Sequence, residues 1–121
     1  MKLKIGIVEV EASDWKRSVK FYRDTLGLDP LYLDEEHKWG QLKAGEITIG
    51  LNGNRQAEYP SNPSRSPVTI IFEVEGIAEA IAALEGRGIE FYDKQLSGDE
   101  GYKIAYFSDP DGNRLAIFKY C

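Results

Sequence analysis

The stretch VEVEASDWKRSVKFYRDTLGL, residues 8–28, determines how the rest of the chain is organised. Its first six residues alternate between apolar and polar side chains, which is typical of a strand whose two faces differ. After them the period changes, and apolar residues such as Trp15 and Val19 recur at the spacing of one helix face. Gly27 then supplies the left-handed conformation that commonly ends a helix. The stretch therefore predicts a strand, a tight turn and a helix over residues 14–26.

The same pattern returns in the second half of the chain. Aligning the two halves places Val8 on Ile70 and Val19 on Ile81, with poor identity but matching periodicity. In the second copy the helix is expected to end at Gly86 or Gly88. The expected strands span residues 2–12, 31–34, 39–43 and 47–51 in the first half and 68–74, 89–92, 102–107 and 114–120 in the second.

Two consecutive copies of a βαβββ unit predict a pseudo-symmetric α+β fold. We expect a single domain over residues 1–121, with units at about 1–53 and 67–121. A connector at about residues 52–67, rich in Asn, Ser and Pro, would join them, and whether it covers a cleft is left open. The mixed sheet would form a cup, with the helices outside and a cleft inside.

Two motifs resemble a known superfamily. The helix sequence SVKFYRDTLGL, residues 18–28, and the turn FSDPDGN, residues 107–113, are similar to the corresponding segments of the vicinal oxygen chelate superfamily. That group includes glyoxalase I, the extradiol dioxygenases, and the bleomycin and fosfomycin resistance proteins. The resemblance covers nearly the whole chain, and it implies this fold, a ligand-binding cleft and a homodimer.

Members with metal chemistry usually carry one ligand, mostly His or Glu, on each of four strands facing the cleft. Matched motif to motif, the resemblance puts those positions at Ile7, Gly50, Thr69 and Ala116, none of which is a good ligand. His37 is the sole histidine, so one chain cannot supply a site of two histidines and a carboxylate. It falls in a polar turn, where we expect a solvated loop residue. We therefore predict no metal and no cofactor.

Strand alternation predicts which side chains line the cleft. Glu9 is the most informative, because a glutamate facing a concavity should be hydrogen-bonded, ion-paired or raised in pKa. It could bind a cationic ligand or act as a general base, or it could form a structural pair with Arg114 or a lysine, or face open water. For the aromatic candidates, a core role is the alternative to ligand stacking. The predicted ligand-binding residues are Glu9, Trp39, Thr48, Asn52, Thr69, Tyr102, Tyr106 and Phe118.

Composition narrows the possible partners. The net charge is −5 and the basic residues are scattered, which argues against a nucleic-acid partner. No apolar run approaches the ~20 residues of a membrane span, so we expect a cytoplasmic protein without membrane contact.

The only cysteine, Cys121, excludes an internal disulfide. No Gly-x-Ser-x-Gly motif occurs and a second histidine is missing, so no catalytic residue is assigned.

Three functions remain open. The first is a metal-free protein of the glyoxalase/bleomycin resistance type that sequesters a small cationic or aromatic compound, as in antibiotic resistance. The second is a glyoxalase-like lyase or isomerase, or a dioxygenase-related enzyme. The third is a dimeric interaction module. The expected partners are a small organic ligand and a second copy of the chain.

Overall fold

The computed structural model describes residues 1–2, 4–54 and 68–121. The chain divides into two compact units, Met1–Pro60 and Ser61–Cys121, and each is described by itself. Of the predicted connector, residues 55–67 lie outside the described residues. Within the described ranges, no helix combines the length and apolar character needed to cross a membrane.

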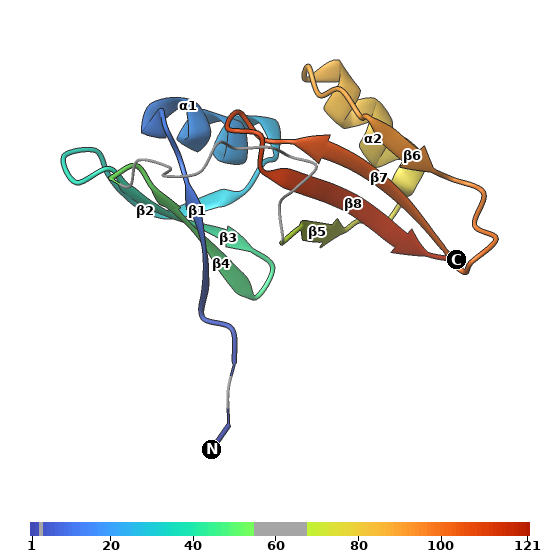
Figure 1. The fold of residues 1–121 in the computed structure, drawn as a ribbon, viewed down its shortest axis with the longest axis horizontal. Coiled ribbons are helices and arrows are strands. Elements are labelled where there is room, and N and C mark those ends of the chain that lie inside the picture. The colour runs from blue at the N-terminus through green and yellow to red at the C-terminus, as the bar shows by residue number, and fades with distance from the viewer. Residues whose placement is uncertain (3, 55–67) are drawn as a thin grey trace. The chain divides into compact units, whose positions relative to one another are not determined.

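The first unit is one mixed four-stranded sheet with a helical segment on one face (Figure 1). The strand order is β1-β4-β3-β2, with β1 parallel to β4 and the other neighbours antiparallel. Its elements are β1 (Ile7–Glu11), α1 (Trp15–Lys20), the π-helical segment η1 (Phe21–Thr25), β2 (Asp29–Asp34), β3 (Trp39–Ala44) and β4 (Ile47–Asn52).

Local chemistry explains the helical segment. The Asp14 carboxylate accepts the N–H of Arg17 at 3.2 Å and caps the start of α1. From Phe21 the helix widens into a π turn, in which the N–H of Leu26 donates to the Phe21 carbonyl. Gly27, with φ of 75°, then ends the segment as predicted. The predicted helix over residues 14–26 is thus present, but it is an α-helix followed by a π-helix.

The first strand is shorter than predicted. Residues 2–12 were expected to be extended, whereas β1 covers only Ile7–Glu11. In the parallel ladder Ile7 lies opposite Thr48, and β4 begins only one residue earlier, after a turn. Residues 4–6 therefore have no neighbouring strand among the described residues, and they run away from the sheet (Figure 1).

The second unit repeats the arrangement. The strand order is β5-β8-β7-β6, with β5 parallel to β8 and the other neighbours antiparallel. Its elements are β5 (Ile70–Glu73), α2 (Ile77–Gly86), β6 (Asp93–Gln95), β7 (Tyr102–Ser108) and β8 (Arg114–Tyr120). Two mixed sheets, each with a helix, confirm the predicted α+β class.

One predicted strand was wrong. The apolar residues 89–92 are not in a strand, and the ladder with β7 forms instead on β6. Ile89 donates its N–H to the carbonyl of Leu84 at 3.0 Å and belongs to the end of the helix. Phe91 packs edge-to-face on Phe107, with ring centroids 5.4 Å apart. The apolar run thus reflects packing of a loop on the core.

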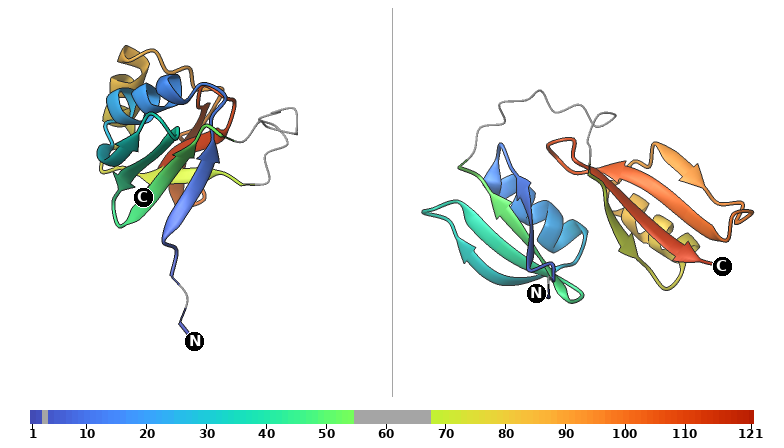
Figure 2. Two further views of the ribbon diagram at one scale, coloured as in Figure 1. Left: turned by 90° about the vertical axis from the view of Figure 1, so that its left-hand side faces the viewer. Right: turned by 60° about the horizontal axis from the view of Figure 1, so that its bottom comes forward.

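Each helix lies across one face of its own sheet (Figure 2). In the first unit Val19 and Tyr22 are buried with Leu42 and Ile49, and in the second Ile81 and Leu84 are buried with apolar side chains of β7 and β8. This burial leaves the opposite face of each sheet available to carry a site.

The predicted turn over residues 108–113 is confirmed. Asp109 is buried, and its Oδ1 accepts the N–H groups of Asp111 at 2.9 Å and Asn113 at 2.8 Å. Gly112 adopts a φ of 82°, the conformation expected of the Asp-Gly pair. The turn positions the start of β8, where Arg114 lies.

Candidate functional site

The candidate site residues lie on the sheet faces opposite the two helices. We call these the first open face, opposite α1, and the second open face, opposite α2. The register puts predicted site residues on the same face as their neighbours in adjacent strands. The first open face carries Ile7, Glu9, Trp39, Thr48, Gly50 and Asn52, and the second carries Thr69, Ile71, Tyr102, Tyr106, Arg114, Ala116 and Phe118.

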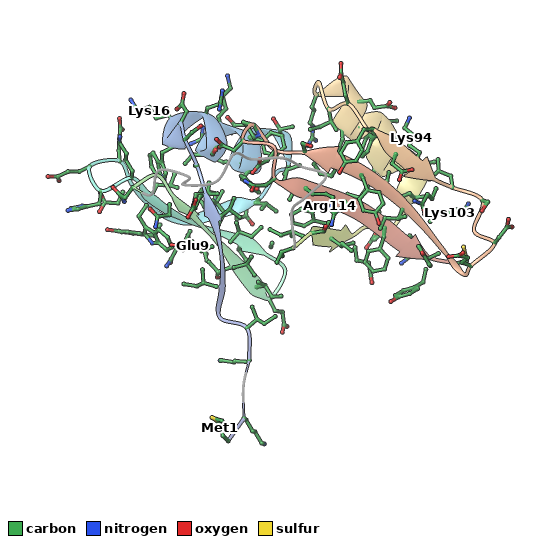
Figure 3. The ribbon with its side chains drawn as sticks, viewed as in Figure 1. Met1, Glu9, Lys16, Lys94, Lys103 and Arg114 are labelled. Carbon is green, nitrogen blue, oxygen red and sulfur yellow. The ribbon has the colours of Figure 1, made fainter. Side chains whose placement is uncertain are left out.

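On the first open face, Glu9 is held by a neighbouring amide. The Nδ2 of Asn52 donates to Oε1 of Glu9 at 2.9 Å, and the Asn52 Oδ1 accepts the N–H of Asn54 at 2.9 Å. Because both ends of the Asn52 amide are engaged, its donor group is oriented toward Glu9. The carboxylate is exposed, so it can meet a cationic group of a ligand (Figure 3).

An aromatic ring lies beside this carboxylate. A Cβ built on Gly50 would be 2.5 Å from Cη2 of Trp39 and 3.0 Å from Cγ2 of Ile7. The indole therefore fills the space that a side chain at Gly50 would need. Thr48 lies farther along the same face, opposite Lys43 in the ladder. The structure thus brings Glu9, Trp39 and Asn52 together.

On the second open face, Arg114 reaches across to β5. Its Nε donates to Oγ1 of Thr69, so this hydroxyl oxygen accepts a hydrogen bond from a guanidinium. Both side chains are half-buried, which makes this hydrogen bond part of the packed face. Thr69 is the residue just before β5, and Arg114 begins β8.

A pocket of about 320 Å³ opens beside this hydrogen bond. Tyr92 and Tyr106 stack along it, with ring centroids 6.4 Å apart and planes 29° from parallel. Partial burial raises the pKa of the Tyr92 phenol, although the Arg114 guanidinium opposes the rise. The phenol therefore stays neutral and can donate a hydrogen bond. The pocket is lined by Thr69, Ile71, Tyr92, Asp93, Gln95, Tyr106 and Arg114.

Two predicted residues lie outside this pocket. Phe118 packs edge-to-face on Tyr120, with centroids 5.1 Å apart, and the Tyr102 hydroxyl donates to Glu100 at 3.3 Å. They share the second open face but do not line the pocket.

Thr69 and Tyr106 were predicted as ligand-binding residues, whereas the other lining residues, Ile71, Tyr92, Asp93, Gln95 and Arg114, were not on that list. The run 89–92 was interpreted as a strand, so Tyr92 was not considered as a wall residue. Residues 93–95 are all polar, so no hydrophobic period in the sequence indicates this short edge strand.

The four positions that the resemblance matches to metal ligands do not fit a metal. Ile7 offers no donor atom, and the Trp39 ring occupies the space in front of Gly50. Thr69 accepts a hydrogen bond from Arg114, and Ala116 is 0% exposed.

The remaining candidate ligands do not assemble either. In the part of the chain that the structure describes, no three His, Cys, Asp or Glu side chains group to hold a metal ion. His37 lies in the turn between β2 and β3, with Nδ1 2.9 Å from Oδ2 of Asp34. It is exposed, in agreement with the expectation of a solvated loop residue.

Comparisons with known proteins give a consistent result. The uncharacterized protein YraH of Bacillus subtilis (strain 168) is 26% identical over 126 residues, covering 97% of this chain and 98% of that protein. The crystal structure of a glyoxalase family protein from Enterococcus faecalis is 29% identical with a TM-score of 0.73, covering 96% of this chain and 97% of the other.

A third similarity concerns the fold alone. TnmS3 from Streptomyces sp. CB03234, described as an antibiotic binding protein, has a TM-score of 0.79 at 22% identity, over 99% of this chain and 98% of its own. The family model of the Glyoxalase/Bleomycin resistance protein/Dioxygenase superfamily matches residues 4–117. The resemblance inferred from the two motifs is thereby confirmed, and the chain belongs to this superfamily.

Proposed function

We propose that this protein is a metal-free binding protein for a small aromatic compound, with preference for a cationic one. The observation that carries the proposal is the Trp39 indole, which lies against Gly50, where a metal ligand is expected by resemblance. An aromatic surface next to the Glu9 carboxylate favours an aromatic cation, because the ring face and the carboxylate both attract positive charge.

Further features support binding rather than metal chemistry. Neither Ile7 nor Ala116 has a donor atom, and Thr69 is engaged by Arg114. The Tyr92–Tyr106 stack adds a second aromatic surface on the second open face. Sites for small organic molecules are commonly built from such aromatic walls with few polar groups. The similarity to TnmS3, an antibiotic binding protein, supports only that this fold is suitable for binding a small molecule.

A panel of three probes with the same ring tests the proposal. Naphthylmethyl-trimethylammonium, naphthalenemethanol and naphthoate carry a cationic, a neutral and an anionic substituent on that ring. We expect the cation to raise the thermal unfolding temperature most, since a ligand at 100 times its Kd adds about 2.7 kcal/mol of stability. In a Trp15→Phe variant, Trp39 is the only remaining tryptophan, and its emission should change on binding. No change of the Trp39 emission with the cationic or the neutral probe would overturn the proposal.

Two variants distinguish the contribution of the Glu9 carboxylate to binding from that of the Trp39 ring. Glu9→Gln should remove the preference for the cation and keep binding of the neutral probe. Glu46→Gln, the same change at an exposed hairpin position, should leave the preference intact. Elemental analysis of the purified protein discriminates the enzyme alternatives, and stoichiometric Zn, Ni, Mn or Fe would contradict the metal-free state.

A further inference from the structure

A second pocket lies in the first unit on the side of the sheet that carries α1. It has a volume of about 390 Å³ and is formed by α1, η1 and the end of β2. We call it the outer pocket, with a floor of Trp15, Val19 and Leu33 and a rim of Lys16, Lys20, Arg23 and Glu35. It is on the opposite face of the sheet from Glu9 and Trp39, so it is separate from the proposed site.

The apolar floor of the outer pocket is accessible because the helix does not fully cover β2. A Cβ built on Gly40 would lie 3.1 Å from Cδ2 of Leu33 and 3.5 Å from Cζ2 of Trp15. The side chains of Leu33 and Trp15 therefore meet above Gly40, which has no side chain of its own. Leu33 is on the outermost strand of the sheet and remains 37% exposed. Trp15 and Val19 are buried and complete the floor.

The rim is cationic. Lys16 and Lys20 are one helical turn apart, and Arg23 follows in η1. Lys16 contacts Glu35 at 2.6 Å and the Arg23 Nε contacts Asp24 at 2.8 Å. Among the described residues Lys20 is in no ion pair, although its charge, after the hydrogen bond from Arg23, helps to lower the pKa of the nearby Asp24 carboxyl. The lining contains three cationic side chains and one carboxylate, whereas the whole chain has a net charge of −5.

We propose that the outer pocket binds a small organic carboxylate with an apolar body, such as an aromatic acid. The apolar body would cover Leu33, the exposed part of the floor, which removes apolar surface from water. The carboxylate would meet Lys20, with Lys16 and Arg23 on either side, in charge-assisted contacts. The volume is within the range that small-molecule pockets occupy in proteins.

Tryptophan emission tests this with the full chain. In a Trp39→Phe variant, Trp15 is the only remaining tryptophan and reports the outer pocket. We expect naphthoate to change its emission saturably, whereas naphthalenemethanol and naphthylmethyl-trimethylammonium bind more weakly. In the wild-type protein the indole N–H resonance of Trp15, which donates to the Leu51 carbonyl, gives the same information without a substitution.

Matched charge variants on one helix test the role of Lys20. Lys20→Gln should weaken naphthoate binding about fivefold, the effect of losing one partly exposed charge contact. Arg17→Gln removes the same charge from the same helix outside the pocket and should leave the affinity unchanged. An unsaturable response of Trp15, equal binding of the neutral probe, or equal weakening by both variants would overturn the proposal. Because Trp39 reports the first open face separately, failure there and failure here are distinguishable.

Discussion

Gly50 is the residue at which the absence of a side chain matters most for the proposed site. The Trp39 ring and Ile7 occupy the space in front of it. The first open face can therefore present a continuous aromatic and apolar surface beside Glu9. A larger residue at this position would have to displace the ring that we propose contacts the ligand.

The cost of filling that space can be measured. Gly50→Ala should lower the free energy of unfolding by about 1–3 kcal/mol, because its Cβ would be 2.5 Å from Cη2 of Trp39. Urea denaturation gives this value. Gly86→Ala, where nothing lies within 4 Å, should instead be neutral or raise stability by under about 1 kcal/mol. Equal effects of the two substitutions would show that the Trp39 ring does not restrict Gly50.

Glu9 shows how far residue-scale prediction reaches. Strand alternation put it on the face opposite the helix, where it lies, and the chemistry of a carboxylate left open a hydrogen bond, an ion pair or exposure to water. The partner is Asn52 on β4, rather than Arg114 or a lysine. Which residue is the partner depends on the register between β1 and β4. Glu9 and Asn52 are 43 residues apart in the sequence, and the local sequence pattern carries no information on this register.

At the scale of single elements, the turn between β2 and β3 depends on one carboxylate. Asp34 Oδ1 accepts the backbone N–H of His37 at 3.1 Å, and its Oδ2 lies 2.9 Å from the His37 ring and 3.3 Å from the Tyr32 hydroxyl. The backbone N–H of His37, followed by its ring, holds the pKa of the Asp34 carboxyl below its usual 3.8.

This lowered pKa makes the stability depend on acid pH. A carboxyl with a lower pKa in the folded state stabilises the fold above the unfolded-state value near 3.8, and this contribution is lost as the pH falls through the folded-state pKa. Urea denaturation at pH values on both sides of 3.8 should show the loss in the wild-type protein and less of it in Asp34→Asn. Tyr32→Phe removes only the weakest contact and should keep most of the effect. Identical profiles for wild type and Asp34→Asn would contradict the prediction.

The helices and strands were predictable where the hydrophobic periodicity continued over many residues. The two helices and the hairpin strands followed from their periodicity and from turn residues such as Gly27 and the Asp-Gly pair. The strand predicted at residues 89–92 is not formed, because loop side chains that pack on the core, such as Ile89 and Phe91, look like strand residues in sequence. The ladder on Asp93–Gln95 is polar and only three residues long, so its pairing with β7 is a tertiary effect.

At the scale of the whole molecule, each sheet has two outermost strands. These are β1 and β2 in the first unit and β5 and β6 in the second. Such strands carry unpaired backbone groups along one side of their own sheet. The duplication was predictable from the aligned halves, because both halves repeat the same periodicity.

We predict that the protein is a homodimer. The resemblance to the superfamily implies it, and unpaired strand edges give a physical reason for association. Light scattering should give twice the monomer mass of 13.6 kDa at both of two well-separated concentrations. A mass of 13.6 kDa at both concentrations would contradict the prediction.

The pairing of the first strand of each unit with its last strand has a consequence for synthesis on the ribosome. β1 can find its parallel partner only after β4 has emerged, and β5 only after β8. Neither sheet can therefore grow strand by strand from its N-terminal end, and each unit must wait until its own final strand is available. The first unit can nevertheless complete its sheet while the second is still being translated, because β1 and β4 both belong to the earlier part of the chain.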